Sequence, residues 1–116
     1  MVIHPHAHPG SFVTIGHSYK NDNKCYALTP NEYWQSSVVW YDTYILLTYD
    51  FDMTFEIYCG DRDEGADGVA FVMQPYSIIF EGNLGEGLGY KGMSPSIAVE
   101  YDTWQNDDPW FDHIAV

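Results

Sequence analysis

Basic side chains are scarce in this sequence of 116 residues. Lys and Arg together number 4 against 17 Asp and Glu, which gives a formal net charge of -13. Because binding to phosphates requires a basic surface, this charge excludes nucleic acid as a partner. The excess of carboxylates fits either a solvated acidic surface or the binding of hard cations through oxygen ligands.

Long apolar runs and cysteines are scarce as well. No run approaches the roughly 20 apolar residues that a membrane-spanning helix needs. The first ten residues have neither the basic region nor the apolar region of a signal peptide. Cys25 and Cys59 are the only cysteines, which is too few for a disulfide framework, and their pairing stays open. Composition alone therefore does not show in which cellular compartment the protein acts.

A helical period is also missing, whereas segments typical of strands are frequent. Residues 51–59 alternate between apolar and polar side chains, as a half-buried strand does. Aromatic residues make up 17% of the chain and favour pleated, half-buried surfaces. The other strand-like segments are 37–41, 43–49, 68–74, 96–104 and 112–116. Turn residues separate these short strands, so the sequence predicts an all-β, antiparallel sandwich.

The length predicts a single domain. We expect residues 1–19 to be an N-terminal leader that could be disordered, and residues 20–116 to form the folded part. His4, His6 and His8 alternate within the leader and could coordinate a transition metal, although a loose terminus is the plainer interpretation. The last strand-like run ends at Val116 with nothing after it to cover the sheet edge. We therefore expect an incomplete sandwich.

The segment "VEYDTWQNDDPWFDH", residues 99–113, concentrates acids beside tryptophans. On a strand, Glu100 and Asp102 project from the same face. If the run that begins near His113 returns beside this strand, its imidazole comes back to those carboxylates. Carboxylates with one imidazole suit a divalent transition ion such as Mn²⁺.

The same segment also offers a set of ligands made only of oxygen. Asp102, Asn106, Asp108 and a loop carbonyl together suit Ca²⁺. Bound cations would also offset the repulsion between neighbouring carboxylates. The alternative is a polar surface loop in which the acids have no such role.

A glycoside hydrolase is a rival interpretation of the same residues. Glu100 and Asp102 match part of the E-x-D-x-x-E arrangement of β-sandwich glycosidases. A retaining enzyme needs a second carboxyl group about 5–5.5 Å from the nucleophile. The corresponding position is Gln105, whose amide cannot donate the proton. The sequence therefore disfavours catalysis.

Three segments together resemble the legume-type (L-type) lectins, most closely their bacterial relatives. They are "GADGVAFVMQ" (65–74), "GNLGEGLGYKGMSPS" (82–96) and "IAVEYDTWQNDDPWFDHIAV" (97–116). The resemblance implies an antiparallel β-sandwich of the concanavalin-like jelly-roll type, with a manganese site beside a calcium site. It covers about residues 20 to 116, and complete domains of this family are considerably longer, so it implies a partial domain.

The resemblance also implies roles for individual residues. The transition ion would be held by Glu100, Asp102, Asp108 and His113. Calcium would be held by Asp102, Asn106, Asp108 and the backbone carbonyl of Trp104. The sugar would be bound by Asp67, Asn106, the ring of Trp104 and a backbone N–H of the glycine loop, with Gly87 as first choice and Gly85 or Gly89 as alternatives. A cis peptide is implied between Ala66 and Asp67.

The function implied is metal-dependent, non-catalytic carbohydrate binding, in an extracellular or cell-surface setting. Two alternatives stay open: a glycosidase on the same fold, and a structural or adhesive module of a larger surface protein. The expected partner is a carbohydrate or glycoconjugate. A second copy, or the rest of a longer chain, would complete the sheet.

Overall fold

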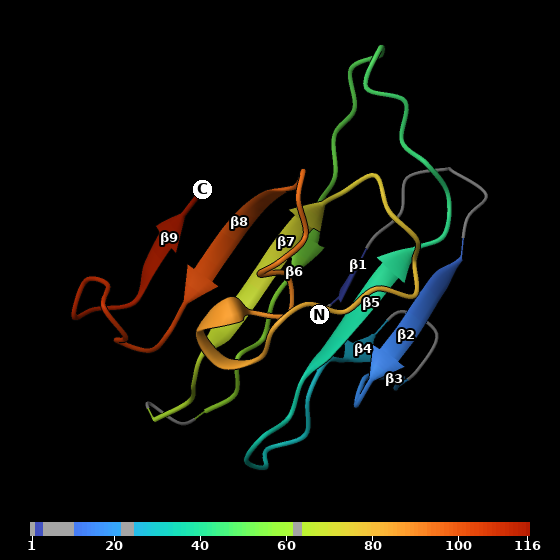
Figure 1. Cartoon of the computed structure of the whole chain (residues 1–116). Helices are drawn as coiled ribbons and strands as arrows, with labels where there is room; N and C mark the ends of the chain where they lie inside the picture. Colours follow the sequence, from blue (N-terminus) through green and yellow to red (C-terminus); the bar gives the residue numbers. More distant parts are fainter. Residues whose placement is uncertain (1, 4–10, 22–24, 62–63) are drawn as a thin grey trace.

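The computed structural model describes residues 2–3, 11–21, 25–61 and 64–116 (Figure 1). The possible metal-binding histidines His4, His6 and His8 lie outside these residues. Within the described part, the only helical element is a short 3-10 turn, η1, and no helix is long and apolar enough to cross a membrane. The elements in chain order are β1 Val2–Ile3, β2 Phe12–Gly16, β3 Tyr19–Lys20, β4 Tyr26–Ala27, β5 Ser37–Tyr41, β6 Phe55–Glu56, β7 Gly68–Met73, η1 Gly85–Gly87, β8 Ile97–Asp102 and β9 His113–Ala115.

Strands β7, β8 and β9 form a three-stranded antiparallel sheet in that order. Its register places Gly68 opposite Asp102, and Asp102 in turn opposite His113. Strand β7 comes from the nearly continuous apolar run 68–74, and β8 from the run 96–104 that begins apolar and then alternates. All strand pairs in the described residues are antiparallel, which confirms the predicted all-β, antiparallel fold class.

Strands β2 and β5 form a second antiparallel pair. The N–H of Ser11 donates to Asp42 Oδ1 at 2.8 Å, and the N–H of Asp42 donates to the Ser11 carbonyl at 2.9 Å. The Ser11 hydroxyl also donates to Asp42 Oδ2 at 2.5 Å. These contacts close the end of the pair. Because β2 lies within residues 1–19, the segment expected to be a leader contains a strand of the fold.

Two segments expected to be strands are mostly irregular. Residues 43–49 form no strand, and of residues 51–59 only Phe55–Glu56 pairs, as β6 with β1. Strand propensity requires a neighbouring backbone to pair with, and apart from Phe55–Glu56 these stretches have none among the described residues. Cys59 lies in this region as an exposed thiol, and it forms no disulfide with Cys25.

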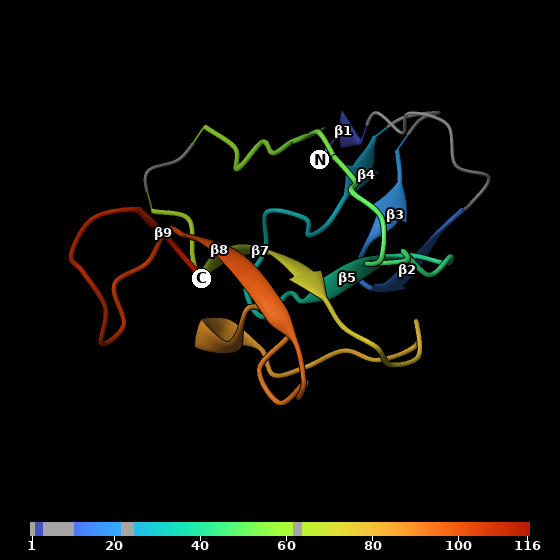
Figure 2. The same ribbon diagram turned by 90° about the horizontal axis from the view of Figure 1, so that it is seen from above.

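The longer strands stand in one row, in the order β9, β8, β7, β5 and β2 (Figures 1 and 2). Seen from above, η1 and the glycine-rich segment around it lie on one side of the row, while β1, β3 and β4 lie on the other (Figure 2). Among the described residues, Tyr26 and Met93 are the only hydrophobic side chains of the core that are buried, none of the described side chains is fully buried, and Asp102 is the buried acid. The core is therefore thin.

Candidate functional site

The pairing of β8 with β9 brings together acidic and imidazole side chains from opposite ends of the segment 99–113. Asp102 ends β8 and faces His113, which begins β9. Asp102 is only 7% exposed, and His113 is half-buried. The predicted return of residues 112–116 beside the preceding strand is confirmed. The use of these side chains as metal ligands stays a prediction.

Local hydrogen bonds orient these two side chains. Asp102 Oδ1 accepts the Trp104 N–H at 2.9 Å, which turns the chain at the end of β8. His113 Nδ1 lies 3.2 Å from the Phe111 carbonyl oxygen. In the tautomer that donates from Nδ1, the lone pair of His113 Nε2 stays available, as in histidines that bind metals.

Asn106 and Asp108 come from the loop between β8 and β9. The Asn106 Nδ2 atom is buried and has no hydrogen-bond partner among the described residues. A buried amide without a partner calls for an explanation, such as a missing ligand. Asp108 is exposed and its carboxylate likewise has no partner in the described part of the chain.

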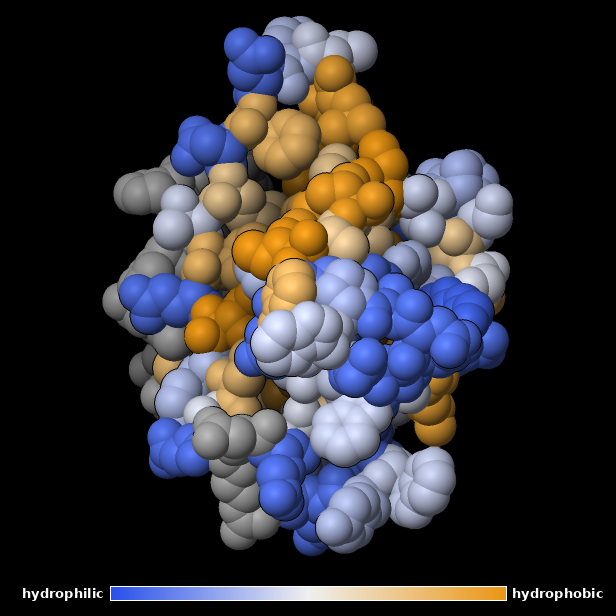
Figure 3. Space-filling view, turned by 90° about the vertical axis from the view of Figure 1, so that its left-hand side faces the viewer, coloured by the Kyte–Doolittle hydropathy of each residue, from blue (hydrophilic) through white to orange (hydrophobic). Residues whose placement is uncertain are grey.

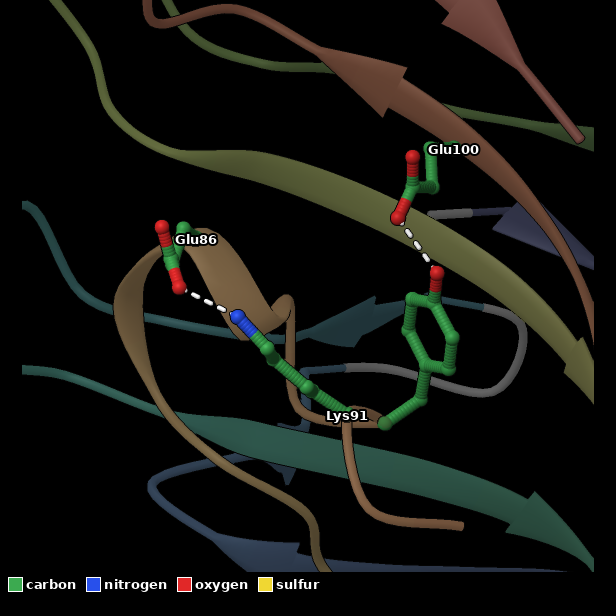
Figure 4. A network of polar contacts seen from close by, with 4 residues as sticks. Glu86, Lys91 and Glu100 are labelled. Atoms are coloured by element: carbon green, nitrogen blue, oxygen red, sulfur yellow. Dashed lines mark hydrogen bonds and ion pairs between the residues drawn. The ribbon is translucent and has the colours of Figure 1, made fainter. Parts of the chain in front are cut away.

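Glu100 is held by the glycine-rich segment that crosses the sheet (Figure 4). The Tyr90 hydroxyl donates to Glu100 Oε1 at 2.5 Å. This hydrogen bond to Glu100 raises the pKa of Tyr90 to about 12. In the same segment, Glu86 and Lys91 form an exposed ion pair. The hydrogen bond of Tyr90 therefore holds the glycine-rich segment against β8, and the ion pair between Glu86 and Lys91 bridges the turn within that segment.

The side chains of this region are of the kinds that bind Ca²⁺ and Mn²⁺. Asp102, Asp108 and Glu100 supply carboxylates, His113 an imidazole nitrogen, and Asn106 an amide oxygen. The backbone register, which places Asp102 opposite His113, supports this fit. Across the described ranges, no three His, Cys, Asp or Glu side chains converge into a ready-made cluster. The side chains would thus have to close around an ion.

Asp67 lies immediately before β7, at the same end of the sheet. The Ala66–Asp67 peptide is cis, which confirms what the resemblance implied. The Thr103 N–H donates to the Asp67 carbonyl at 3.1 Å, and its hydroxyl donates to the Gly65 carbonyl at 3.1 Å. Thr103 thus joins the Asp67 turn to the loop that carries Asn106. The Asp67 carboxylate has no hydrogen-bond partner among the described residues.

The glycine loop meets Asp67 at a different residue from the one preferred on sequence grounds. A Cβ atom at Gly85 would lie 3.8 Å from Asp67 Oδ2, and the Gly85 N–H finds no acceptor in the described part of the chain. The Gly87 N–H instead donates to the Leu84 carbonyl at 3.2 Å, and the Gly89 N–H donates to the Asn83 carbonyl at 3.0 Å. The geometry therefore favours Gly85 over Gly87 as a donor beside Asp67.

Trp104 follows the end of β8 and is 48% exposed. It forms no ring contact with another described aromatic residue, whereas Trp110 packs edge-on against Phe111 with centroids 5.6 Å apart. The alternative that Trp104 simply packs against Trp110 is therefore not what the structure shows. Its half-exposed ring suits a platform for the apolar face of a ligand.

Sequence reasoning missed two residues that shape this region. Thr103 ties the Asp67 turn to the loop, and Tyr90 holds Glu100. Thr103 and Tyr90 stand inside the motif segments, so their position was a usable signal. Which glycine N–H faces Asp67 depends on the path of the backbone, and the sequence carries no signal for it.

Comparisons with known proteins identify the family of the chain. The family model of the legume lectin beta-barrel domain matches residues 6–115. A pesticidal crystal protein, Cry22Aa of Bacillus thuringiensis, is similar over 60 residues at 38% identity, which covers 52% of this chain and 8% of that protein. The matched part is thus a small fraction of that relative. No solved structure matched the chain. The chain belongs to the legume (L-type) lectin family, and this membership supports lectin-like carbohydrate binding in general.

Proposed function

We propose that this chain binds carbohydrate without catalysis and that binding depends on Ca²⁺ and a transition ion such as Mn²⁺. The observation that carries the proposal is the register of β7, β8 and β9. It aligns Gly68, Asp102 and His113 across three strands, so that Asp67 lies beside the start of the acidic loop. Residues suited to bind metal and residues suited to bind sugar thereby meet at one end of the sheet.

The sugar contacts follow from the chemistry of four groups. The Asp67 carboxylate accepts hydrogen bonds from two hydroxyls, and the Asn106 amide and the Gly85 N–H donate to hydroxyl oxygens. All three groups lack partners among the described residues. Trp104 covers the C–H face of a pyranose ring. Such a combination fixes the orientation of the sugar as well as its affinity.

The metal ligands hold the loop that presents these groups. Glu100, Asp102, Asp108 and His113 would hold the transition ion, and Asp102, Asn106, Asp108 and the Trp104 carbonyl would hold calcium. When bound, the cations supply positive charge that neutralises the clustered carboxylates. Asn106 would direct its oxygen to the metal side and its Nδ2 to the sugar. Thr103 positions Asp67 against the same loop.

A binding role agrees better with these residues than a hydrolytic one. Gln105 stands where a second carboxyl group would be required. In a glycosidase, Glu100 would be the nucleophile. It is half-buried and accepts a hydrogen bond from the Tyr90 hydroxyl. We further propose an extracellular or cell-surface setting, with a glycoconjugate as the partner.

A charge-matched pair of variants tests the proposal. Asp67→Asn removes the acceptor for two hydroxyls, whereas Asp50→Asn removes one negative charge at an exposed residue of the loop between β5 and β6. Each hydrogen bond to a charged group is worth about 1.5–3 kcal/mol, so Asp67→Asn should weaken binding at least about tenfold. Binding is measured on a glycan array and then by calorimetry on the best glycan. Equal affinity of the two variants would contradict the assignment of Asp67.

A further inference from the structure

The segment 31–35, here called the aromatic loop, joins β4 to β5 and carries two large rings side by side in the sequence. Tyr33 and Trp34 are each 91% exposed, and neither packs against another ring of the described residues. The backbone of Trp34 has a φ of +61°, a region that bulky residues rarely adopt. Such conformations persist where the surrounding structure holds them, and they cluster at ligand-binding sites. The aromatic loop thus presents to solvent two rings that add nothing to the core.

Hydrogen bonds from three neighbouring segments hold the base of the aromatic loop. The Ser36 hydroxyl donates to Glu81 Oε1 at 2.6 Å, and the Ser36 carbonyl accepts the His17 N–H at 3.1 Å. The Ser37 hydroxyl donates to the Leu28 carbonyl. The partners lie just after β2, just after β4 and just before the glycine-rich segment. The two rings therefore stand on an ordered base, which reduces the conformational entropy that a ligand must remove on binding.

The glycine-rich segment links the aromatic loop to the proposed sugar site. A Cβ atom at Gly85 would lie 3.8 Å from Asp67 Oδ2, and one at Gly89 would lie 3.7 Å from the Ser37 carbonyl oxygen, just after the aromatic loop. Figure 1 shows the loop that leads into β5 and the turn before β7 at the same end of the strand row. Trp34 and Asp67 also line one hollow of about 2210 Å³, whereas pockets for one small ligand measure about 300–1,000 Å³. The space they share therefore admits a ligand longer than one sugar.

The surroundings of the aromatic loop favour an uncharged ligand rich in hydroxyls. Glu32 is the only charged residue of the loop, in a chain with a formal charge of -13. Lys91 of the glycine-rich segment is paired with Glu86, so an anionic ligand would meet repulsion here. Hydrophilic side chains predominate over the lower part of the face in Figure 3, whereas strongly apolar ones gather over its upper part. Exposed rings among polar groups match the apolar face and the hydroxyl rim of a pyranose.

We propose that the aromatic loop is a second contact site for the glycan, which makes neutral oligosaccharides the preferred ligands over monosaccharides. The inference rests on the proposed function, because one sugar unit is held at Asp67. The Trp34 ring covers a further unit of the same glycan. Binding of the first unit at Asp67 brings the next units close to the ring, so the second contact adds affinity at little further entropic cost. Trp34 therefore sets the preference for length and leaves the binding of a single sugar unchanged.

Calorimetric titration of the full chain, loaded with Ca²⁺ and Mn²⁺, tests this inference. The probes are series of glucose, galactose, mannose and N-acetylglucosamine in α and β linkage, each from the monosaccharide to the tetrasaccharide. The native chain should bind its best series more tightly as the glycan lengthens. Trp34→Asn removes the ring but keeps a residue that tolerates a positive φ. It should weaken tetrasaccharide binding about fivefold and leave monosaccharide binding unchanged, which also shows that the variant is folded.

Two further variants complete the comparison. Trp34→Tyr keeps an aromatic ring and should retain most of the gain in affinity with length. Trp110→Ala is the matched control, because Trp110 is 79% exposed on the loop between β8 and β9 and does not line the hollow. It should bind every member of the series as the native chain does.

The outcomes separate this inference from the function on which it rests. If the native chain bound monosaccharides and tetrasaccharides equally well, the second contact would be refuted and the site at Asp67 would stand alone. If the gain with length survived in Trp34→Asn, residues other than Trp34 would make the contact. A loss of monosaccharide binding in that variant would place Trp34 in the Asp67 site and contradict a separate contact. A native chain that bound none of the glycans would overturn the proposed function and this inference together.

Discussion

At the scale of single residues, two tryptophans on one loop differ in what they contact. Trp104 is half-exposed at the end of β8 without a ring partner in the described residues, while Trp110 is 79% exposed and packs edge-on against Phe111. They have the same chemistry and belong to the same loop. Only Trp104 follows directly from the buried Asp102 through a hydrogen bond. Comparing substitutions of Trp104 and Trp110 therefore distinguishes a role in sugar binding, proposed for Trp104, from the effect of removing an exposed tryptophan.

Trp104→Ala is expected to weaken carbohydrate binding at least about fivefold, because an aromatic platform contributes roughly 1 kcal/mol or more beyond simple burial. Trp110→Ala is the matched control and should leave the affinity within error of the native chain. Isothermal titration of the same glycan into both variants provides the comparison. If Trp110→Ala alone weakened binding, the sugar platform would have to be reassigned.

At the scale of elements, the junction of β7 and β8 leaves no room for a side chain at Gly68. Its φ is +139°, and an added Cβ atom would overlap the Tyr101 carbonyl oxygen. Gly68→Ala should therefore destabilise the chain by about 1–3 kcal/mol, the cost of forcing a residue into a rare backbone region. The measurement is the urea midpoint. Gly60→Ala serves as the control for a positive φ, since a Cβ there meets nothing within 4 Å. Equal midpoints for the two variants would contradict the close approach.

The hydrogen bonds between Ser11 and Asp42, at the ends of β2 and β5, predict that the stability of the fold depends on pH. Hydrogen bonds from the Ser11 hydroxyl and N–H lower the pKa of Asp42 below its usual value of 3.8. The ionised carboxylate thus favours the folded state. Its contribution is fully present above the ordinary pKa and is lost as the pH falls through the lowered pKa of the folded chain. Asp42→Asn should make the urea midpoint less sensitive to pH below about pH 4. If the urea midpoint of Asp42→Asn depended on pH as that of the native chain does, the hydrogen bonds between Ser11 and Asp42 would not stabilise the fold.

Sequence patterns predicted the elements best where each strand has a pairing partner among the described residues. The runs 37–41, 68–74, 96–104 and 112–116 correspond to β5, β7, β8 and β9. The run 43–49 has equal strand character, yet it forms none, because no neighbouring backbone lies beside it to pair with. Strand β2 was missed because it follows a stretch rich in His and Pro that is typical of a loose terminus.

The register of the candidate site could be predicted, whereas the ligand roles of its side chains stay predictions. Spacing alone suggested that His113 returns to Asp102, and the pairing of β8 with β9 confirms that return. The glycine that approaches Asp67 could not be predicted, because Gly85, Gly87 and Gly89 are chemically identical. Only the path of the backbone decides which N–H is already used within the turn.

At the scale of the whole molecule, a thin core leaves the stability of the fold dependent on what binds the chain. A ligand that binds only the folded state stabilises it by about 2.7 kcal/mol at a hundredfold excess over its Kd. Calcium and manganese are therefore expected to raise the melting temperature by several degrees, and a chelator to reverse the shift. Differential scanning calorimetry with Mg²⁺ as the control ion measures this effect. Equal melting temperatures with and without chelator would argue against the metal ligands assigned here.

The central claim is that metal and sugar sites share the end of the sheet formed by β7, β8 and β9, so that sugar binding requires metal. The direct measurement is calorimetric titration of one glycan into the same protein in three states: loaded with Ca²⁺ and Mn²⁺, fully chelated, and reloaded. The account predicts binding in the first state, its loss in the second and its return in the third. Binding that persists at full strength after complete chelation would contradict it.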